Sequence, residues 1–407
     1  MTDNTLNVLY LTYDGLTDPL GQSQIIPYMQ GMASLGYSIT IISCEKTDRL
    51  EKDGSVIQSL LQQFGIQWQP VLYSNVIPVV SQLTTLHRLY KAAKKLLQQK
   101  NYSIIHCRST LPAMVGYRLK KQFSIPLIFD MRGFWAEERV EGNIWPQNKI
   151  LYRSIYKYIL KQEKMLLAES DHIISLTNAG KQIMLNQQVK KPISVIPCCA
   201  DFQHFNPETI SANASLELRR KLSIPDDAFV LIYTGSIGTW YLLDEMMQFF
   251  KEFVSAHENS FFLLVTREKH ELINTAAQKA KAPLSKIKMA SAGRNEMPLY
   301  LSLANASIYF IKPGFSKQAS SPVKQGEALS MGIPVITNSG IGDSDDIIFT
   351  NNFGWVLLLN SDYGKAIQEI KSTPTDSGEI RRKSHEILSL ESGIEKYLKV
   401  YKSVTNQ

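Results

Sequence analysis

A short segment in the second half of the chain combines a cation, a carboxylate and a helix start. Lys324 and Glu327 follow Ser321 and Pro322, and Gly332 closes the segment. Ser321 is a favourable N-cap and Pro322 suits a first helical position, so we predict a helix from Pro322 to the residue before Gly332. The N–H groups at its start attract anions, whereas the helix dipole disfavours Lys324 there. A bound anion such as a diphosphate would remove this conflict.

Glu327 lies one turn beyond Lys324, on nearly the same face of the predicted helix. A carboxylate at that place can accept hydrogen bonds from two sugar hydroxyls. Phosphate charge next to a diol indicates a nucleotide or a nucleotide sugar as the ligand. The alternative is an ordinary capped helix with a solvated lysine and glutamate, and the segment alone does not decide between the two.

The composition indicates two ordinary domains and an anionic partner. The chain has 407 residues, of which 44% are hydrophobic, and its net charge is +7. Nucleotide phosphates or an acidic membrane surface fit this charge, whereas no Lys/Arg run is long enough to favour nucleic acid. The four cysteines lack zinc spacing and suit a reduced cytoplasmic protein. No signal peptide and no apolar run of roughly 20 residues is found, so we expect any membrane contact to be peripheral.

Apolar strand-like runs alternate with helical segments along the chain. A turn-rich polar stretch over 200–227 interrupts this alternation, which then restarts. Such alternation predicts parallel β-α-β units with both sheet faces covered. We therefore predict an α/β protein with two Rossmann-like domains facing each other across a cleft. The first domain covers 1–200 together with a C-terminal helix at about 390–407 that packs back on it, and the second covers 201–389.

Polar residues cluster after a buried strand that ends at Phe129. Ligands of open parallel sheets bind at such carboxyl ends. Asp130 is a candidate to orient an acceptor hydroxyl, and Arg132 is a candidate to meet a phosphate. Trp135 suits stacking on a sugar ring, and Glu138 suits binding of sugar hydroxyls. The alternative is an ion pair between Asp130 and Arg132 that only shapes the loop.

Further candidates follow other strands. His106 and Arg108 end a strand of the first half, where Arg108 suits a phosphate contact and His106 suits an acceptor. A satisfied core histidine is the alternative for His106. In the second half, Arg267 follows the strand over 261–265 and is a candidate phosphate ligand, unless it is an ordinary surface arginine.

Two Rossmann-like domains with a restart in the middle resemble the GT-B glycosyltransferases, and four segments resemble glycosyltransferase family 4. In chain order they are Pro19–Ser23, Cys199–Pro207, Thr234–Gly238 and Ser321–Ile336. The resemblance implies a donor site that includes Gly21 in a glycine-rich loop and the residues Gly235, Ser236, Arg294, Ser320 and Ser321. It also implies catalytic roles, for which we select Asp130, Arg132, Arg267, Lys324 and Glu327.

Two positions depart from the pattern of that family. The family often has two glutamates seven residues apart, and here Ala319 occupies the first position. Many members also have a basic pair after the first strand of the second domain, whereas the segment from Gly235 to Leu243 has no Lys or Arg. We therefore expect other residues to hold the diphosphate, with Arg267 as the first candidate.

The resemblance implies a hexosyltransferase that moves a sugar from a nucleotide diphosphate sugar to an acceptor, with retention of configuration. We assign no DxD-like acidic metal site, so we expect no metal or other cofactor. A GT-B nucleotide-sugar epimerase and a non-catalytic nucleotide-sugar binding protein are the alternatives. A glycan or lipid-linked acceptor of surface polysaccharide synthesis would suit a cytoplasmic, basic enzyme.

Two amphipathic helices in the first domain are rich in lysine and arginine. The first carries an apolar stripe from Leu83 to Leu97, and the second covers 149–161. A basic helix with aromatic residues can lie on an anionic membrane. The alternative for each helix is a core stripe with a solvated charged face.

Overall fold

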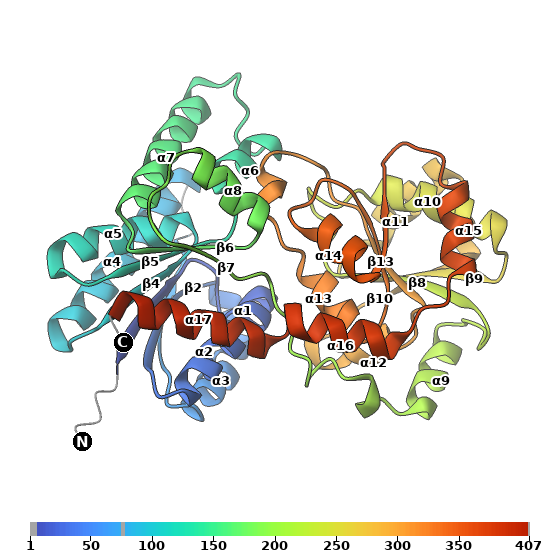
Figure 1. Ribbon diagram of the computed structural model, residues 1–407, viewed down its shortest axis with the longest axis horizontal. Helices are drawn as coiled ribbons and strands as arrows, with labels where there is room; N and C mark the ends of the chain where they lie inside the picture. The colour runs from blue at the N-terminus through green and yellow to red at the C-terminus, as the bar shows by residue number, and fades with distance from the viewer. Residues whose placement is uncertain (1–5, 75–77, 406–407) are drawn as a thin grey trace. The chain divides into compact units, whose positions relative to one another are not determined.

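The computed structural model describes residues 6–74 and 78–405 (Figure 1). The chain forms two compact units. Unit 1 takes in the chain up to Pro197, the short segment Ser316–Ser320 and everything from Leu390 onward. Unit 2 consists of Cys198–Phe315 and Ser321–Ser389. The sequence places the division at 200/201, and in the structure it falls between Pro197 and Cys198.

Unit 1 is built on a seven-stranded parallel sheet in the order β3-β2-β1-β4-β5-β6-β7. The order reverses between β1 and β4, which makes the carboxyl ends of these strands a switch point suited to ligands. β1, β4 and β5 are almost entirely buried, as expected of parallel strands covered on both faces. The strands are β1 (Asn7–Thr12), β2 (Ser38–Glu45), β3 (Gln67–Leu72), β4 (Ile104–Arg108), β5 (Leu127–Met131), β6 (His172–Ser175) and β7 (Ile193–Val195).

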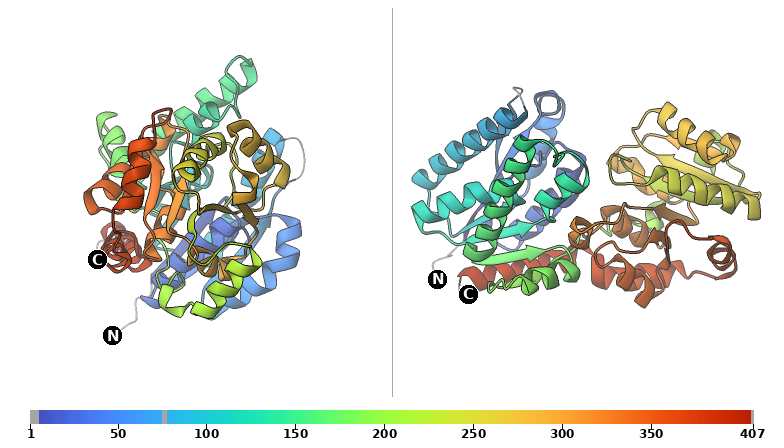
Figure 2. Two further views of the ribbon diagram at one scale, coloured as in Figure 1. Left: turned by 90° about the vertical axis from the view of Figure 1, so that its right-hand side faces the viewer. Right: turned by 90° about the horizontal axis from the view of Figure 1, so that it is seen from above.

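Helices cover both faces of this sheet (Figures 1 and 2). The final helix, α17, packs against α2 and β4 and so completes the cover of one face. The helices of unit 1 are α1 (Pro19–Gln24), α2 (Ile26–Ser34), α3 (Thr47–Gln62), α4 (Pro78–Gln99), α5 (Thr110–Phe123), α6 (Trp135–Glu141), α7 (Ile150–Glu169), α8 (Asn178–Asn186) and α17 (Leu390–Thr405).

Unit 2 has a six-stranded parallel sheet in the order β10-β9-β8-β11-β12-β13. Its order also reverses, between β8 and β11, so the carboxyl ends of these two strands form the second switch point. The predicted α/β class with two Rossmann-like sheets is therefore confirmed. The strands are β8 (Phe229–Thr234), β9 (Ser260–Val265), β10 (Ile287–Ala290), β11 (Ala306–Tyr309), β12 (Val335–Asn338) and β13 (Gly354–Leu357).

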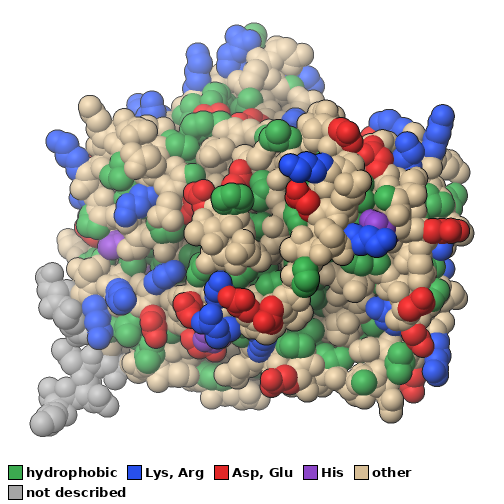
Figure 3. Space-filling model, turned by 45° about the vertical axis from the view of Figure 1, so that its right-hand side comes forward, with side chains coloured by type: hydrophobic (Ala, Val, Ile, Leu, Met, Phe, Trp, Pro, Cys, Tyr) green, Lys and Arg blue, Asp and Glu red, His purple; other side chains and the backbone are tan. Residues whose placement is uncertain are grey.

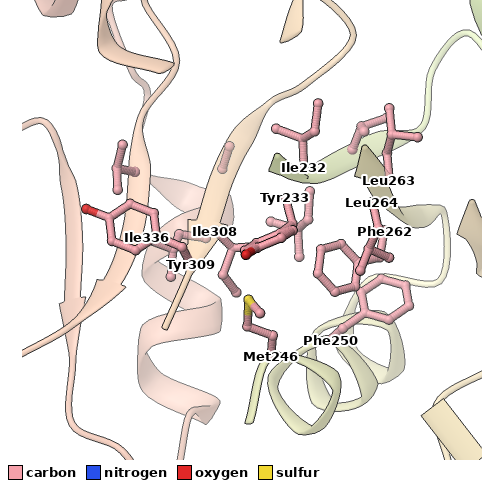
Figure 4. Packing of buried hydrophobic residues seen from close by; sticks show 14 of the residues in the cluster. Ile232, Tyr233, Met246, Phe250, Phe262, Leu263, Leu264, Ile308, Tyr309 and Ile336 are labelled. Atoms are coloured by element: carbon pink, nitrogen blue, oxygen red, sulfur yellow. The ribbon is translucent and has the colours of Figure 1, made fainter. Parts of the chain in front are cut away.

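The core of unit 2 packs aromatic and aliphatic side chains between the sheet and α10 (Leu243–Ala256). Met246 and Phe250 from α10 point toward Tyr233 and Phe262 from the sheet (Figure 4). α10 begins only at Leu243. Tyr241 bridges to Ile311 and the Leu242 N–H donates to the Phe310 carbonyl, so extended pairing holds these residues out of the helix.

The remaining helices of unit 2 follow its strands. Short 3-10 turns occur at Pro207–Thr209, Leu284–Lys286 and Arg294–Glu296. The α-helices are α9 (Ala212–Lys221), α11 (His270–Ala280), α12 (Met297–Leu301), α13 (Val323–Ser330), α14 (Ser344–Asn351), α15 (Gly364–Ser372) and α16 (Ser377–Leu388).

The short turn η4 (Ser316–Ala319) belongs to unit 1 although it follows β11 in sequence. The Lys317 ammonium lies 3.0 Å from a Glu138 carboxylate oxygen of α6. The Ser316 hydroxyl donates to Glu141 at 2.6 Å, and the Thr177 hydroxyl donates to the Gln318 carbonyl at 2.6 Å. Local sequence patterns do not predict this docking, because all of its partners are distant in the chain.

Candidate active site

The N-terminus of α13 has no side-chain cap, whereas the sequence predicts a cap at Ser321. Pro322 is the N-cap residue, and no side chain caps the helix. The Ser321 hydroxyl instead accepts a hydrogen bond from the Cys198 N–H at 3.1 Å, so the predicted Ser321 cap is wrong. Gly332 does end the segment as predicted, with φ of +73°. The N-terminal N–H groups of α13 thus have no side-chain acceptor and can bind an anion.

Lys324, in the first turn of α13, is a buried cation without a hydrogen-bond acceptor in the described part of the chain. Its ammonium lies 4.0 Å from the centroid of the Tyr233 ring and 3.4 Å from that of Tyr241. Burial lowers the pKa of Lys324 well below its usual value. The two rings offset part of the desolvation cost by cation–π attraction, but they accept no ordinary hydrogen bond.

The glycine loop after β8 approaches this ammonium. A side-chain carbon added at Gly235, where φ is +99°, would lie 3.9 Å from the Lys324 nitrogen. Glu268 holds the loop in place, since its carboxylate accepts hydrogen bonds from the Ser236 hydroxyl at 2.9 Å and from the Ile237 N–H at 3.3 Å. The structure thus brings Gly235 and Lys324 together, while the Ser236 hydroxyl is engaged with Glu268.

Glu327 lies half-buried one turn beyond Lys324. Burial raises the pKa of Glu327 to about 7, although the positive charges of Arg294 and Lys324 oppose this rise. The Arg294 carbonyl lies 3.0 Å from the Nε2 atom of His204. Its guanidinium lies over the Phe205 ring at 5.7 Å. Lys324, Glu327 and Arg294 therefore form one electrostatically coupled group in unit 2.

Glu327→Gln should change how the stability of the ligand-free protein depends on pH. The folded protein raises the pKa of Glu327 from 4.5 to about 7, so its ionisation disfavours the folded state. The contribution of this carboxyl is therefore fully present below pH 4.5 and is lost as the pH rises through 7. The loss amounts to about 3 kcal/mol. Denaturant unfolding across this pH range should show this loss of unfolding free energy from Glu327 in the wild type and not in the variant. Parallel curves of unfolding free energy against pH for the two proteins would contradict the raised pKa of Glu327.

Arg267 is exposed in the loop that follows β9. Its neighbour Glu268 contacts the glycine loop, as described above. Of the five residues predicted to be catalytic, Arg267, Lys324 and Glu327 lie in unit 2, and the other two lie in unit 1. The predicted donor residues divide in the same way, because Ser320 belongs to unit 1 and Ser321 to unit 2.

Asp130 lies fully buried in β5 and is the centre of a charged cluster in unit 1. Its carboxylate accepts a hydrogen bond from the Tyr397 hydroxyl of α17 at 2.8 Å and lies 3.4 Å from the Arg132 guanidinium. Arg108 lies 3.9 Å away on the other side. Burial alone would raise the pKa of Asp130, but the charge of Arg132, the His106 ring, whose Nε2 atom lies 3.6 Å away, and the charge of Arg108 outweigh it and hold the pKa below its usual range. The ion pair of Asp130 with Arg132 is thus present.

His106 and Arg108 are also enclosed in this cluster. His106 exposes no surface, and its Nδ1 atom lies 2.8 Å from the Tyr401 hydroxyl. Burial lowers the pKa of His106, which keeps the ring neutral at neutral pH. This placement agrees with the core-histidine alternative. The Arg108 Nε donates to the Asp14 carboxylate at 3.2 Å, so Arg108 links the ends of β4 and β1.

The two remaining acceptor candidates lie on α6. Trp135 begins the helix, with the Arg139 guanidinium 5.2 Å from its ring centroid and the Trp145 ring edge-on at 5.2 Å. The Glu138 carboxylate is paired with Lys317. Both side chains therefore take part in the packing of unit 1 in the absence of ligand.

Gly21 lies inside α1 and not in an open loop. A side-chain carbon added there would lie 2.1 Å from the Gly15 carbonyl oxygen and 2.7 Å from the Leu16 Cα atom. Glu45 also stabilises this loop. Its buried carboxylate accepts hydrogen bonds from the Leu16 N–H at 2.6 Å and from the Thr17 hydroxyl at 2.6 Å. Gly21 is therefore required for the close approach of α1 to this loop.

Gly21→Ala is expected to displace the loop and to destabilise unit 1 by about 1–3 kcal/mol, the range for overpacked sites. The midpoint of urea unfolding, followed by circular dichroism, measures this. Gly378→Ala serves as the control, because its added carbon would lie 3.3 Å from the end of the Asp376 side chain and would meet no backbone atom that closely. An unchanged midpoint for Gly21→Ala would contradict the packing role.

Sequence reasoning misses several residues that shape these sites. Tyr233 and Tyr241 enclose Lys324, and Tyr397 and Tyr401 join α17 to the cluster around Asp130. Buried tyrosines usually find a partner for their hydroxyl, and the spacing of Tyr397 and Tyr401 by one helical turn is a usable signal. No local signal pairs them with Asp130 and His106, which lie in distant strands.

Comparison with known proteins agrees with this architecture. The model of Glycosyltransferase Family 4 matches residues 27–204, most of which lie in unit 1. No protein of curated function matches the sequence. Sucrose-phosphate synthase from Thermosynechococcus elongatus is similar in structure, with a TM-score of 0.70, 16% identity and coverage of 98% of this chain and 99% of that one.

Two further solved structures are similar along nearly their whole length. A glycosyltransferase from Rickettsia africae has a TM-score of 0.67 and 17% identity, with coverage of 98% of this chain and 99% of that one. Anabaena HepE in complex with UDP-glucose has a TM-score of 0.68 and 12% identity, with coverage of 98% and 100%. At such identities the likeness establishes the fold. The chain therefore has the two-domain α/β fold of the GT-B glycosyltransferases, and its residues 27–204 match Glycosyltransferase Family 4.

Proposed function

We propose that the protein is a glycosyltransferase that moves a sugar from a nucleotide diphosphate sugar to an acceptor, and that unit 2 binds the donor. One observation carries the proposal. Among the residues that the structure describes, the buried Lys324 ammonium has no hydrogen-bond acceptor, and it lies beside the glycine loop in the first turn of α13, whose N-cap residue provides no side-chain cap. An unpartnered buried cation is costly, and a diphosphate would supply both the missing acceptors and the missing charge.

The donor site would act by stabilising the leaving group. As the bond to the sugar breaks, negative charge accumulates on the departing nucleoside diphosphate. Lys324 and the first N–H groups of α13 would oppose this charge without reorganising, because both are fixed in a site with little water. Glu327 would accept hydrogen bonds from two hydroxyls of the ribose or of the transferred sugar.

The finer assignments are also proposals. Unit 1 would bind the acceptor, a glycan or lipid-linked glycan of surface polysaccharide synthesis, and transfer of a hexose would proceed with retention in the cytoplasm. The match of residues 27–204 to Glycosyltransferase Family 4 supports transferase chemistry. The UDP-glucose bound to HepE makes UDP-sugars the first donors to test. We propose no metal in catalysis, since cationic groups of the chain would take the role of a metal at the diphosphate.

One observation favours a non-catalytic nucleotide-sugar binding protein as the second candidate. Ala319, at the place of the first glutamate of the family pattern, is buried in the core of unit 1 beside Gly180. A packing residue thus stands where the family pattern would place a carboxylate. A GT-B epimerase remains the other enzyme alternative to be tested.

A panel of nucleotide sugars separates these functions. A ligand that binds only the folded protein at about 100 times its Kd stabilises it by about 2.7 kcal/mol, which raises the melting temperature by several degrees. Donors that shift melting are then incubated with the protein, with and without glycan acceptors, and the products are identified by mass spectrometry. Transfer supports the proposal, isomerisation supports an epimerase, and binding without turnover supports a binding protein. No shift with any nucleotide sugar would overturn the donor site.

A further inference from the structure

The outward face of α7 exposes large apolar side chains that no other part of unit 1 covers in the structure. Ile150 is 79% exposed, Leu151 is 61% exposed and Tyr158 is 54% exposed. Ile144, in the loop before the helix, is 42% exposed. Single exposed apolar residues are ordinary, but a group of them at one end of one helix indicates a contact surface.

Cations surround these apolar residues. Lys149, Arg153, Lys157 and Lys161 follow one another at steps of four residues, and Lys164 continues the face; all five are exposed. None of the five forms an ion pair with a carboxylate in the described ranges 6–74 and 78–405. Like charges spaced by four residues destabilise a helix, so this face is electrostatically unfavourable unless an anion lies against it.

The same stretch of sequence is poor in carboxylates. Between residues 142 and 168 the sequence has a single one, Glu163. Glu163 points inward, where it accepts hydrogen bonds from the Thr110 hydroxyl at 3.0 Å and from the Ala136 N–H at 3.3 Å. Ile159 and Leu166 are buried on the same inward side. The packing of α7 therefore fixes which face is outward, and from residue 150 to residue 168 that face is basic, apolar or neutral polar, with no carboxylate.

Space-filling shows where this face lies. Lys and Arg side chains gather at the top of the molecule in Figure 3, which is where α7 begins in Figure 1. The described part of the chain has no helix that combines the length and apolar character needed to cross a bilayer. A surface of this kind would therefore act by lying against a membrane and not by spanning it.

The other basic amphipathic helix, α4, differs from α7 because its apolar stripe is buried. Its stripe is part of the core of unit 1, where Leu89, Ala93 and Leu97 are buried. The Tyr90 hydroxyl donates to Gln122 at 2.9 Å, and the Arg118 guanidinium lies 4.4 Å from the Tyr90 ring centroid. The core-stripe interpretation thus holds for α4, and only its start, with Val80 and Leu83 exposed, resembles α7.

We propose that the outward face of α7 binds the anionic lipid surface of a membrane, with Ile150, Leu151 and Tyr158 in the headgroup region and the lysines against lipid phosphates. Lysine-rich charge with aliphatic residues and a tyrosine suits a lipid interface, because both apolar insertion and electrostatic attraction contribute there. Nucleic acid would engage the charges and leave Ile150 and Leu151 without a partner. The proposal does not depend on the donor site in unit 2.

Sedimentation with vesicles tests the charges. The full chain is mixed with vesicles of phosphatidylcholine containing about a third of phosphatidylglycerol, the anionic fraction supplying the surface potential. Lys157→Gln/Lys161→Gln/Lys164→Gln should lower the partition coefficient roughly 100-fold, since each lysine near an anionic surface changes it about fivefold. The matched variant Lys91→Gln/Lys94→Gln/Lys95→Gln removes the same charge from α4 and should change it less than about fivefold. Equal losses for the two variants would overturn the proposal.

A second pair of variants tests the apolar contact. Ile150→Ser/Leu151→Ser should weaken vesicle binding on the order of tenfold, and this loss should persist at high salt, where electrostatic attraction is screened. Val80→Ser/Leu83→Ser on α4 should leave binding unchanged. All four variants should keep the melting temperature of the wild type, because the substituted positions are exposed or nearly so.

The ligand specificity supplies the remaining outcome. Binding to anionic vesicles and not to pure phosphatidylcholine supports the proposal. Failure to bind anionic vesicles at low salt would overturn it. A preference for nucleic acid would also overturn it. The protein would then bind a random single-stranded oligonucleotide but no vesicles, and the Ile150→Ser/Leu151→Ser variant would bind the oligonucleotide as well as the wild type does.

Discussion

Replacing Lys324 by methionine is expected to stabilise the ligand-free protein and to abolish donor binding. The ammonium is buried against two tyrosine rings without a hydrogen-bond acceptor. Methionine has a similar length and no charge, and it packs well against aromatic rings. Removing a buried charge that has no hydrogen-bond acceptor among the described residues should raise the free energy of unfolding by about 1–3 kcal/mol, although the lost attraction to Glu327 and to the two rings offsets part of this gain.

The same substitution should remove the thermal shift caused by the donor. In a transfer assay it should lower kcat/KM by at least about 100-fold, as expected when a fixed group that stabilises leaving-group charge is lost. Opposite changes in stability and in binding are the signature of a residue kept for function. Lys365→Met, at a 90% exposed position of unit 2, is the control and should change neither quantity. A Lys324→Met protein that still binds donor would disprove the site.

Replacing Asp130 by asparagine should be among the most destabilising single changes in unit 1. The change keeps the shape of the side chain but removes the buried negative charge that lies 3.4 Å from Arg132 and 3.9 Å from Arg108. Breaking a buried pair in this way costs about 3–5 kcal/mol. The urea midpoint, followed by circular dichroism, measures the effect. Glu51→Gln, an exposed carboxylate of α3, should shift it little.

The pH dependence gives a second measure of the same carboxylate. The folded protein lowers the pKa of Asp130 below its usual 3.8, so its contribution to stability is present above that value and is lost as the pH falls through the folded pKa. Tyr397→Phe removes one hydrogen bond while keeping the ring, and should cost about 1.5–3 kcal/mol, as for a bond to a charged group. If Asp130→Asn lowers the free energy of unfolding by less than Tyr397→Phe does, the negative charge of Asp130 is not the main stabilising interaction of this cluster.

The sequence predicts much of the fold because the governing signals are local. Buried parallel strands such as β8 and β9 are almost entirely apolar runs, and α10 shows its inward face by the spacing of Met246, Phe249 and Phe253. The residue at which α10 begins does not follow from this spacing, because Tyr241 pairs with Ile311, which is distant in the chain. Ser321 fails as a cap for the same reason, since the distant Cys198 N–H competes for its hydroxyl.

The candidate site is predictable in part. The resemblance and the helix-start argument find Lys324 and Glu327, and the structure couples the two. The aromatic surroundings of Lys324 were not predictable, because Tyr233 belongs to a core strand and Tyr241 to an apolar helical pattern. Likewise, nothing near His106 in the sequence indicates that Tyr401 will be its partner.

The division of the chain affects the order in which a nascent polypeptide can mature. Unit 1 contains the first half of the chain but also Ser316–Ser320 and the helix from Leu390 onward. While the ribosome is still adding the last residues, Asp130 and His106 lack the tyrosine hydroxyls that satisfy them. Unit 1 is therefore translated first but can complete its fold only after unit 2 has been synthesised. A fragment ending at Pro197 would expose a charged, incomplete interior to aggregation and proteolysis.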